Sequence, residues 1–427
     1  MESGIYKNMH ETIKKPLLYT LMLSVFLDVA NFFMPIPIYT PLFLKTAFLQ
    51  DISPSTKAVM LGYLIACYGF MQLFSGPIFG SLSDKYDRKK ILSLSLILST
   101  FSCLLSGISL GLGSIKLIYI SRLLLGFSSG TIAIVFAITA DKSNENNRAK
   151  NLGYITAGTS LGAVFGPFIG GYLVSSPKFS WFGYATPFYI MIIPYLINLF
   201  LLRKFLVVSP AKHANKKFYL LKGFENIYKV IQNSASLFYL VLMVLLFQLA
   251  CESFYLAAPI IAVKKLHLSP AIIGNHFFAQ GITAILVSLF FNKKLSKYFS
   301  SSKLFLINIF LLFSCFLLLS IAKSSFVLYL PFLGLGSFGT LCWIHSNNLF
   351  SKAVTENQQG LIFGVSQALW AFASIFGSII VGFSAAVHYT FSIIVPIFSG
   401  LLSCILAIIL VFIVEKKQPI EAPIILF

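Results

Sequence analysis

Twelve long apolar stretches, separated by short polar segments, run along the chain. Each holds roughly 20 residues, the length that an α-helix needs to cross the hydrocarbon core of a bilayer. The pattern therefore predicts an all-α integral membrane protein with twelve transmembrane helices. The expected spans are residues 17–40, 57–83, 90–111, 114–140, 149–174, 185–206, 237–263, 270–291, 303–322, 325–349, 359–384 and 389–414.

The longest polar segment lies between the sixth and seventh spans and divides the helices into two sets of six. Sequence echoes at an offset of about 210 residues favour a duplicated six-helix unit: Leu82–Tyr86 resembles Leu295–Tyr298, and Ser129–Thr131 resembles Phe338–Thr340. We therefore expect two pseudo-symmetric bundles. The predicted segments are an N-terminal segment 1–16, a first bundle 17–206, a central linker 207–236, a second bundle 237–414 and a tail 415–427.

The distribution of charge supports membrane insertion and predicts an orientation. Only 11% of the residues are charged, whereas a soluble protein carries about 25%. With the N-terminus in the cytoplasm, 24 of the 32 Lys and Arg residues fall on the cytoplasmic side, seven on the other side and one within a span. The positive-inside rule then places both termini of this multi-pass protein in the cytoplasm. The net charge of +19 belongs to these loops and does not indicate nucleic-acid binding.

Ionisable side chains deep in predicted spans are candidates for function, because a charge there costs at least ~2.5 kcal/mol and usually faces a cavity. Asp28 lies midway along the first span, before Pro35 and Pro37, which break the regular helix. A partly desolvated carboxyl group at this position could bind and release a proton near neutral pH. The alternative is a structural acid that is hydrogen-bonded between helices.

Glu252 occupies the corresponding place in the first span of the second half. We expect it to take part in proton coupling or to bind a cationic group of a substrate. It could instead pair with Lys264 or Lys265. Arg122, which lies within the fourth span, needs an acceptor at this depth, and Asp28 is a candidate.

Other polar side chains in the spans carry weaker signals. His345, Asn347 and Asn348 make the later part of the tenth span polar and are candidates for substrate binding. His276 stands alone in the eighth span and is expected to be a packing residue with satisfied hydrogen bonds. The six cysteines lie inside apolar spans without metal-ligand spacing, so no metal site is expected.

Two stretches contain small residues in patterns that indicate a tight loop or a close contact between helices. Gly80–Lys89 begins with a small residue and becomes densely charged, which is typical of a tight loop at the membrane surface. In the fifth span, glycines four apart line one face, where helices can approach closely, and Pro167 adds a kink. These glycines are Gly158, Gly162, Gly166 and Gly170. The contact is simple tight packing, a device that sets which side the cavity opens to, or both.

These motifs together resemble those of the major facilitator superfamily, in its twelve-helix drug:proton antiporter branch. Gly80–Lys89 is similar to the loop motif G-x-L-x-D-x-x-G-R-K, with Asp87 in place of the family's glycine. Gly162–Gly171 matches the whole helix-five motif G-x-x-x-G-P-x-x-G-G, and Arg122–Gly126 matches the helix-four motif R-x-x-x-G. Asp28 and the following P-x-P resemble the first-helix motif, without its usual glycines.

The resemblance implies alternating access, in which two six-helix bundles rock around a central site. It also implies that Asp84 and Arg88 lock one conformation at the cytoplasmic helix ends. Arg122 would assist proton transfer, and the helix around Gly166 and Pro167 would hinder leak.

The sequence thus predicts a proton-coupled secondary transporter of the inner (plasma) membrane that exports a small amphipathic molecule, such as a drug, a metabolite or a siderophore. The alternative is a proton symporter that imports a nutrient or an iron–siderophore, and a minor alternative is a non-transporting membrane sensor. No catalytic cluster and no nucleotide-binding Gly-rich loop is present, so neither an enzyme nor a cofactor is expected. Sodium stays open as the coupling ion, and a monomer is expected.

Overall fold

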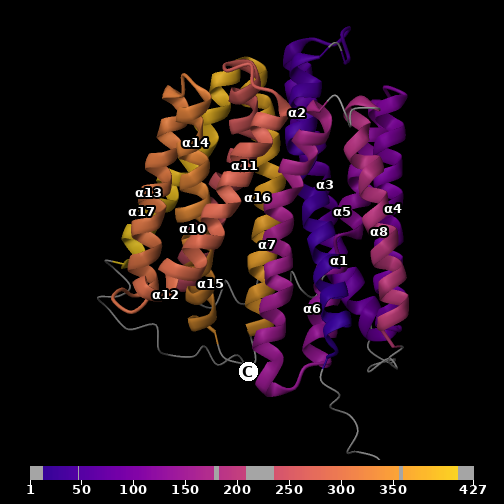
Figure 1. Cartoon of the computed structure of the whole chain (residues 1–427). Coiled ribbons are helices and arrows are strands. Elements are labelled where there is room, and N and C mark those ends of the chain that lie inside the picture. The colour runs from indigo at the N-terminus through magenta and orange to yellow at the C-terminus, as the bar shows by residue number, and fades with distance from the viewer. Residues whose placement is uncertain (1–12, 47, 177–181, 208–234, 355–358, 412–427) are drawn as a thin grey trace, which may run out of the picture. The chain divides into compact units, whose positions relative to one another are not determined.

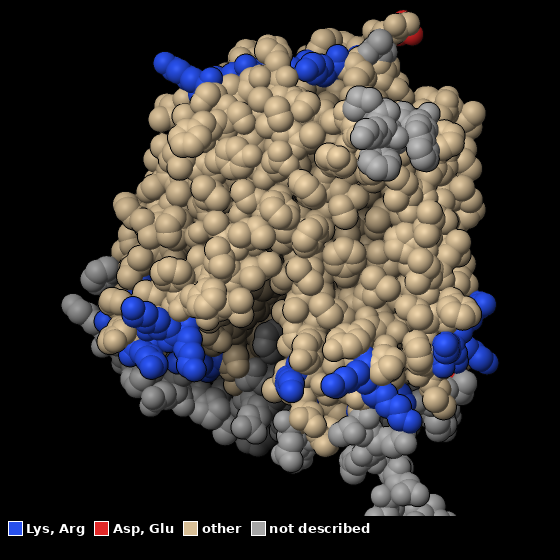
Figure 2. Space-filling model, viewed as in Figure 1, with Lys and Arg blue, Asp and Glu red and all other residues tan. Residues whose placement is uncertain are grey.

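The computed structural model describes residues 13–46, 48–176, 182–207, 235–354 and 359–411, and every regular element in these ranges is a helix. Twelve helices in the described ranges are long and apolar enough to cross a membrane. The predicted all-α, twelve-span fold is therefore confirmed. On the face shown in Figure 2, Lys and Arg gather at the helix ends, and the surface between these ends carries neither. Most of the N-terminal segment, the linker and the tail lie outside the described residues.

The contacts of the chain cluster into two units. Unit 1 holds the residues up to Pro35 and those from Met71 to the end of the sixth span, and unit 2 holds Ile36–Phe70 and the six spans after the linker. Residues 36–70, which the sequence places in the first bundle, thus make their main contacts with the second half of the chain. In each unit the helices run side by side (Figure 1).

In its described residues, unit 1 holds seven helices, one of them only in part, and one short turn of 3-10 helix. They are α1 (Lys15–Phe33), the second part of α3 (Pro54–Lys85), α4 (Arg88–Gly111), α5 (Ile115–Ser128), α6 (Thr131–Asp141), α7 (Glu145–Ser175), η2 (Gly183–Ala185) and α8 (Thr186–Phe205). A short break divides the fourth span into α5 and α6. A break near Pro35 ends α1, because proline removes a backbone donor from the helix. The first span nevertheless continues to Lys45 and is longer than predicted.

Unit 2 contains the continuation of the first span and the remaining helices. They are α2 (Ile36–Lys45), the first part of α3, α10 (Ala235–Lys264), α11 (Pro270–Leu286), α12 (Asn292–Leu295), α13 (Ser301–Ile321), α14 (Ser325–Gly334), α15 (Thr340–Lys352), α16 (Gln359–Val387) and α17 (Ile394–Ile409). The described part of unit 2 also holds two π turns, η3 (Val287–Phe291) and η4 (Leu335–Gly339), and the 3-10 turn η6 (Tyr389–Ile393). Here α2 packs on α10 and α11.

Small hydroxyl side chains line the contact of α4 with α5. The Ser99 hydroxyl donates to the Ser128 hydroxyl at 2.8 Å, and the Ser102 hydroxyl donates to the Ser121 carbonyl oxygen at 2.8 Å. All four residues are buried. Small residues let the helix backbones approach, and each hydroxyl finds a partner, which a group at membrane depth requires because no water is present.

Helix α7 packs against α1 through its row of glycines. A Cβ atom on Gly162 would lie 2.5 Å from the Phe26 carbonyl oxygen, and one on Gly166 would lie 2.8 Å from the Ala30 Cα atom. Gly158 meets α1 one turn earlier in the same way. The glycines four apart on α7 thus face residues four apart on α1. The predicted close contact is confirmed, and its partner is the helix that carries Asp28.

We predict that Gly166→Leu destabilises the protein by about 1–3 kcal/mol, because the added side chain meets rigid backbone atoms of α1. The measurement is the unfolding temperature of the purified protein in a neutral detergent. Gly153→Leu on the same helix is the matched control, since a Cβ atom there meets nothing within 4 Å. Equal stability of the two variants would contradict the tight contact.

Candidate functional site

The Asp28 side chain lies inside unit 1, on α1, and is 1% exposed. Neither carboxyl oxygen has a hydrogen-bond partner among the described residues. The structural alternative raised by the sequence, an acid that is hydrogen-bonded between helices, is therefore absent in this conformation. Arg122 is also buried, on α5, but its candidate pair with Asp28 is not formed. The positions of the two residues along their spans indicate depth in the membrane, but they do not show on which face of each helix the side chain lies.

A chain of hydrogen bonds surrounds α1 next to Asp28. The Asn31 amide donates to the Cys103 Sγ atom at 3.1 Å and to the Tyr195 hydroxyl at 3.4 Å. The Tyr195 hydroxyl in turn donates to the Leu27 carbonyl oxygen at 3.0 Å. Tyr195 also lies close enough to interact electrostatically with Asp28. These side chains satisfy one another and leave the carboxyl group without a donor.

Two residues of α8 in this region were missed by sequence reasoning. Tyr195 reaches Leu27 and Asn31, and the Asn198 amide donates to the Ser24 hydroxyl at 2.8 Å. Both residues are fully buried. Their spacing of three in an otherwise apolar span is the signal that could have found them, because residues three apart share one helix face.

Glu252 lies inside unit 2, on α10, and is 5% exposed. The Trp370 indole N–H of α16 donates to its carboxyl oxygen Oε1 at 2.6 Å. Gln248, one helical turn earlier, is also buried, and its amide has no hydrogen-bond partner in the described part of the chain. The alternative pairing of Glu252 with Lys264 or Lys265 is wrong: Lys265 donates to the Ser320 carbonyl oxygen at 3.1 Å. Twelve residues of helix, about 18 Å, separate Glu252 from Lys264.

The three polar candidates of the tenth span have different surroundings. His345 is fully buried, and neither of its ring nitrogens has a hydrogen-bond partner among the described residues. The Asn347 amide donates to the Trp343 carbonyl oxygen at 2.8 Å and accepts from the Ser366 hydroxyl at 3.1 Å. Asn348 is exposed. The structure therefore does not bring the three together into one cluster.

His276 is a packing residue with satisfied hydrogen bonds, as predicted. Its ring nitrogens lie 2.7 Å from the Ile272 carbonyl oxygen and 3.0 Å from the Ser325 carbonyl oxygen. Its ring stacks on Tyr329 with centroids 4.0 Å apart. The described parts of the chain contain no group of three or more possible metal ligands.

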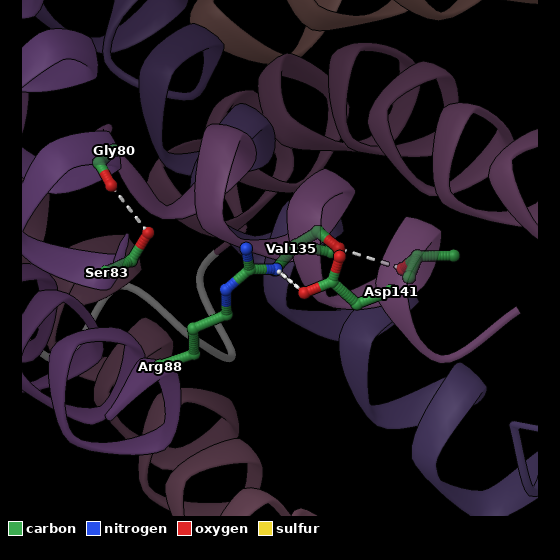
Figure 3. A network of polar contacts seen from close by, with 6 residues as sticks. Gly80, Ser83, Arg88, Val135 and Asp141 are labelled. Atoms are coloured by element: carbon green, nitrogen blue, oxygen red, sulfur yellow. Dashed lines mark hydrogen bonds and ion pairs between the residues drawn. The ribbon is translucent and has the colours of Figure 1, made fainter. Parts of the chain in front are cut away.

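The first residue of α4, Arg88, forms an ion pair with Asp141 at the end of α6 (Figure 3). The Arg88 guanidinium lies 2.7 Å from the Asp141 carboxylate, with the two side chains 17% and 33% exposed. Gly80 accepts a hydrogen bond from the Ser83 hydroxyl at 2.8 Å. The Asp84 side chain lies outside the described residues. Asp141, the last residue of the fourth span, was missed by sequence reasoning because nothing local marks it as the partner of Arg88.

Asp87, which stands where the family motif has a glycine, begins helix α4 as its N-cap. Its carboxylate accepts a hydrogen bond from the Lys89 backbone N–H at 2.9 Å. Such a cap satisfies one of the free donors at the start of a helix. The turn thus follows the shape that an acidic cap requires, and its φ of −59° needs no glycine.

Twelve helices of membrane-spanning length, in two units that each bury a carboxyl group, favour a membrane transporter. The chain belongs to the Major Facilitator Superfamily, whose family model matches residues 21–250 and 240–425.

Relatives and solved structures agree with this assignment. The chain is 25% identical to Multidrug resistance protein 2 of Bacillus subtilis over 398 residues, which cover 88% of this chain and 91% of that protein. It is 26% identical to Quinolone resistance protein NorA of Staphylococcus aureus over 415 residues, which cover 94% and 97%. The crystal structure of a D-xylose–proton symporter has the same fold, with a TM-score of 0.72 and 18% identity over 92% of this chain and 96% of that chain.

We predict that Arg88→Asp and Asp141→Arg each lower the unfolding free energy by up to about 1 kcal/mol, because each places like charges opposite one another. The double variant should recover most of the loss, since it restores the pair in reverse. The measurement is a double-mutant cycle on the unfolding temperature. Lys90→Asp, at the exposed cation two residues on, is the control and should not be rescued by Asp141→Arg. Additive losses in the double variant would show that the pair contributes nothing.

Proposed function

We propose that this protein exports a small amphipathic molecule across the inner (plasma) membrane in exchange for protons, by alternating access. The observation that carries the proposal is the Asp28 carboxyl group, which is buried at membrane depth without a hydrogen-bond partner in the described residues. Two relatives are named for resistance to several drugs and to quinolones, which favours outward movement of a drug-like molecule.

The surroundings of Asp28 suit a group that gains and loses a proton. An uncompensated negative charge in a buried, apolar place is costly. We therefore propose that the carboxyl group is protonated in this conformation and ionises when water reaches it from the other side of the membrane. Tyr195 and Asn31 form hydrogen bonds with other groups. They therefore fix the helices around the site without donating to the Asp28 carboxyl group.

The contact of α1 with α7 suits a device that moves Asp28 between two environments. Gly162 and Gly166 join the two backbones so closely that the helices must move together. We propose that Gly170 and Pro167 extend and bend this contact, which seals α1 against leak. At the predicted cytoplasmic end, the Arg88–Asp141 pair holds α4 to α6, and Gly80 and Asp84 belong to the same lock.

Glu252 is proposed as the second coupling or substrate group, in unit 2. The Trp370 indole N–H holds its carboxyl group in place, and the unpartnered Gln248 amide lies one turn away. A cationic substrate group could take the place of this indole at the carboxylate. His345 is the next candidate, because both of its ring nitrogens are buried without a partner among the described residues.

The remaining assignments of residues and partners follow from the sequence and stay proposals. Arg122 assists proton transfer, and Asn347 and Asn348 contact substrate. The proton gradient supplies the energy without a cofactor, both termini face the cytoplasm, and the protein works as a monomer in the bilayer.

We predict that Asp28→Asn abolishes proton exchange without unfolding the protein, because the amide cannot release a proton. The measurement is internal pH in proteoliposomes of known orientation on addition of cationic dyes, with the unfolding temperature as a check of folding. Asp51→Asn, at an exposed acid, is the matched control. Full proton exchange by Asp28→Asn would overturn the assignment of Asp28, and protons moving with the substrate would replace export by import.

We predict that Glu252→Gln raises the KM for a monocationic dye at least about tenfold, which corresponds to about 1.4 kcal/mol of lost attraction. A neutral substrate should be affected much less, because only the charge is removed. Initial rates in the same proteoliposomes provide the measurement. An equal change for charged and neutral substrates would assign Glu252 to proton coupling or packing and not to substrate binding.

A further inference from the structure

One end of unit 2 carries an excess of positive charge where the positive-inside rule predicts few basic residues. This end is the one predicted to face away from the cytoplasm. Its lysines are Lys45, Lys57, Lys264, Lys265 and Lys323. The acids of unit 2 in the described ranges are Asp51, which is exposed near this end, and Glu252, which lies about 18 Å along α10 from Lys264. The lysines therefore have almost no local counter-charge.

A cavity of about 200 Å³ opens at this end, entirely within unit 2, and Lys264 is the one of these lysines that lines it; Leu44 and Ala58, the chain neighbours of Lys45 and Lys57, also line it. Its walls come from α2, α3, α10, α16 and η6 and are mostly apolar. They include Leu44, Ala58, Ile260 and Ala386, with the Lys264 side chain and Tyr389 also lining the space. The volume is below the roughly 300 Å³ at which pockets for drug-sized ligands begin. The cavity therefore suits a small ligand with an apolar body.

The charge at this cavity is not balanced by the protein. The ammonium groups of Lys57 and Lys264 are close enough to repel each other, and no carboxylate in the described part of the chain contacts either one. The adjacent lysines Lys45 and Lys265, in contrast, donate hydrogen bonds to backbone oxygens. Lys45 donates to the His267 carbonyl oxygen at 3.1 Å, and Lys265 donates to the Ser320 carbonyl oxygen at 3.1 Å. An anion in the cavity would relieve the repulsion between Lys57 and Lys264 and would meet apolar walls behind them.

We propose that this cavity binds a small amphipathic anion, that is, a carboxylate or phosphate group attached to a short apolar chain. The anionic group lies between the ammonium groups of Lys57 and Lys264. The apolar part lies against Leu44, Ala58, Ile260 and Ala386. Such an anion is either a free solute or the head-group end of a lipid, since both present this chemistry.

The position of the cavity gives the ligand an effect on conformation. Its walls join residues 36–70 to the helices after the linker. One helical turn along α3 from the lining residue Ala58, the backbones of α3 and α16 are in contact. A Cβ atom on Gly62 would lie 2.6 Å from the Ser378 carbonyl oxygen and 3.0 Å from the Gly382 Cα atom. A ligand that binds only while these walls are together stabilises that packing. This consequence for transport rests on the alternating access proposed above, whereas the binding itself does not.

The experiment measures direct binding of trifluorohexanoate to the full-length protein in a neutral maltoside detergent, by broadening of its fluorine NMR signal. We expect saturable binding that the matched cation, trifluorohexylamine, does not show. Lys264→Gln should weaken it at least about tenfold, because half of the positive pair is lost. Ala386→Leu should abolish it by filling the cavity. Lys323→Gln removes the same charge from an exposed position at the same end and should leave the affinity unchanged.

Short-chain dihexanoyl phosphatidate, measured by its phosphorus NMR signal, distinguishes the two sources of the anion. Binding of trifluorohexanoate that depends on Lys264 supports a free solute, and binding of phosphatidate alone with the same dependence supports a lipid head group. The proposal is overturned if neither probe binds, or if Lys323→Gln weakens binding as much as Lys264→Gln. It is also overturned if the cation binds as well as the anion. Because no transport is measured, failure of the proposed function would leave these outcomes unchanged.

Discussion

The backbone contact between α1 and α7 is the constraint on which the site in unit 1 depends. In lipid, helices gain little from burying apolar surface, so close packing of small residues holds them together. Gly162 and Gly166 bring α7 onto α1, and the hydrogen bonds of Asn31 and Tyr195 tie α1 to α4 and α8. Asp28 is thereby positioned through its helix, and its own carboxyl group makes no hydrogen bond to a described residue.

The two buried carboxyl groups differ in a way that separates their roles. Asp28 has no hydrogen-bond partner in the described residues, whereas Glu252 accepts a hydrogen bond from Trp370. A hydrogen bond to a carboxylate offsets part of the cost of its charge. This difference supports the separate roles that we propose, in which Glu252 binds a cationic group and Asp28 responds to a change of surroundings.

The twelve spans were predictable because span length and hydropathy are local properties of the sequence. The glycine face of α7 was also predictable, since residues four apart share one face, but its partner α1 was not. Pairings across distant segments, such as Arg88 with Asp141, leave no mark in either segment. The candidate pair of Arg122 with Asp28 is not formed for a related reason: position along a span gives depth but not the face of the helix. The alternative pairing of Glu252 with Lys264 was excludable from the sequence, because twelve residues of helix span about 18 Å. The apolar pattern predicts that the first span ends near residue 40, whereas Pro41 lies inside α2, which continues to Lys45.

The N-cap at Asp87 changes the mechanical character of the loop between α3 and α4. A glycine there would be a joint with wide freedom of φ and ψ, and much of that freedom would be lost on folding. The acidic cap instead fixes the first turn of α4. In the alternating access that we propose, a rearrangement at this end would break or remake the ion pair of Arg88 with Asp141, while α4 would move as a rigid helix from its first residue. The capped loop would then act as a rigid connection and not as a flexible one.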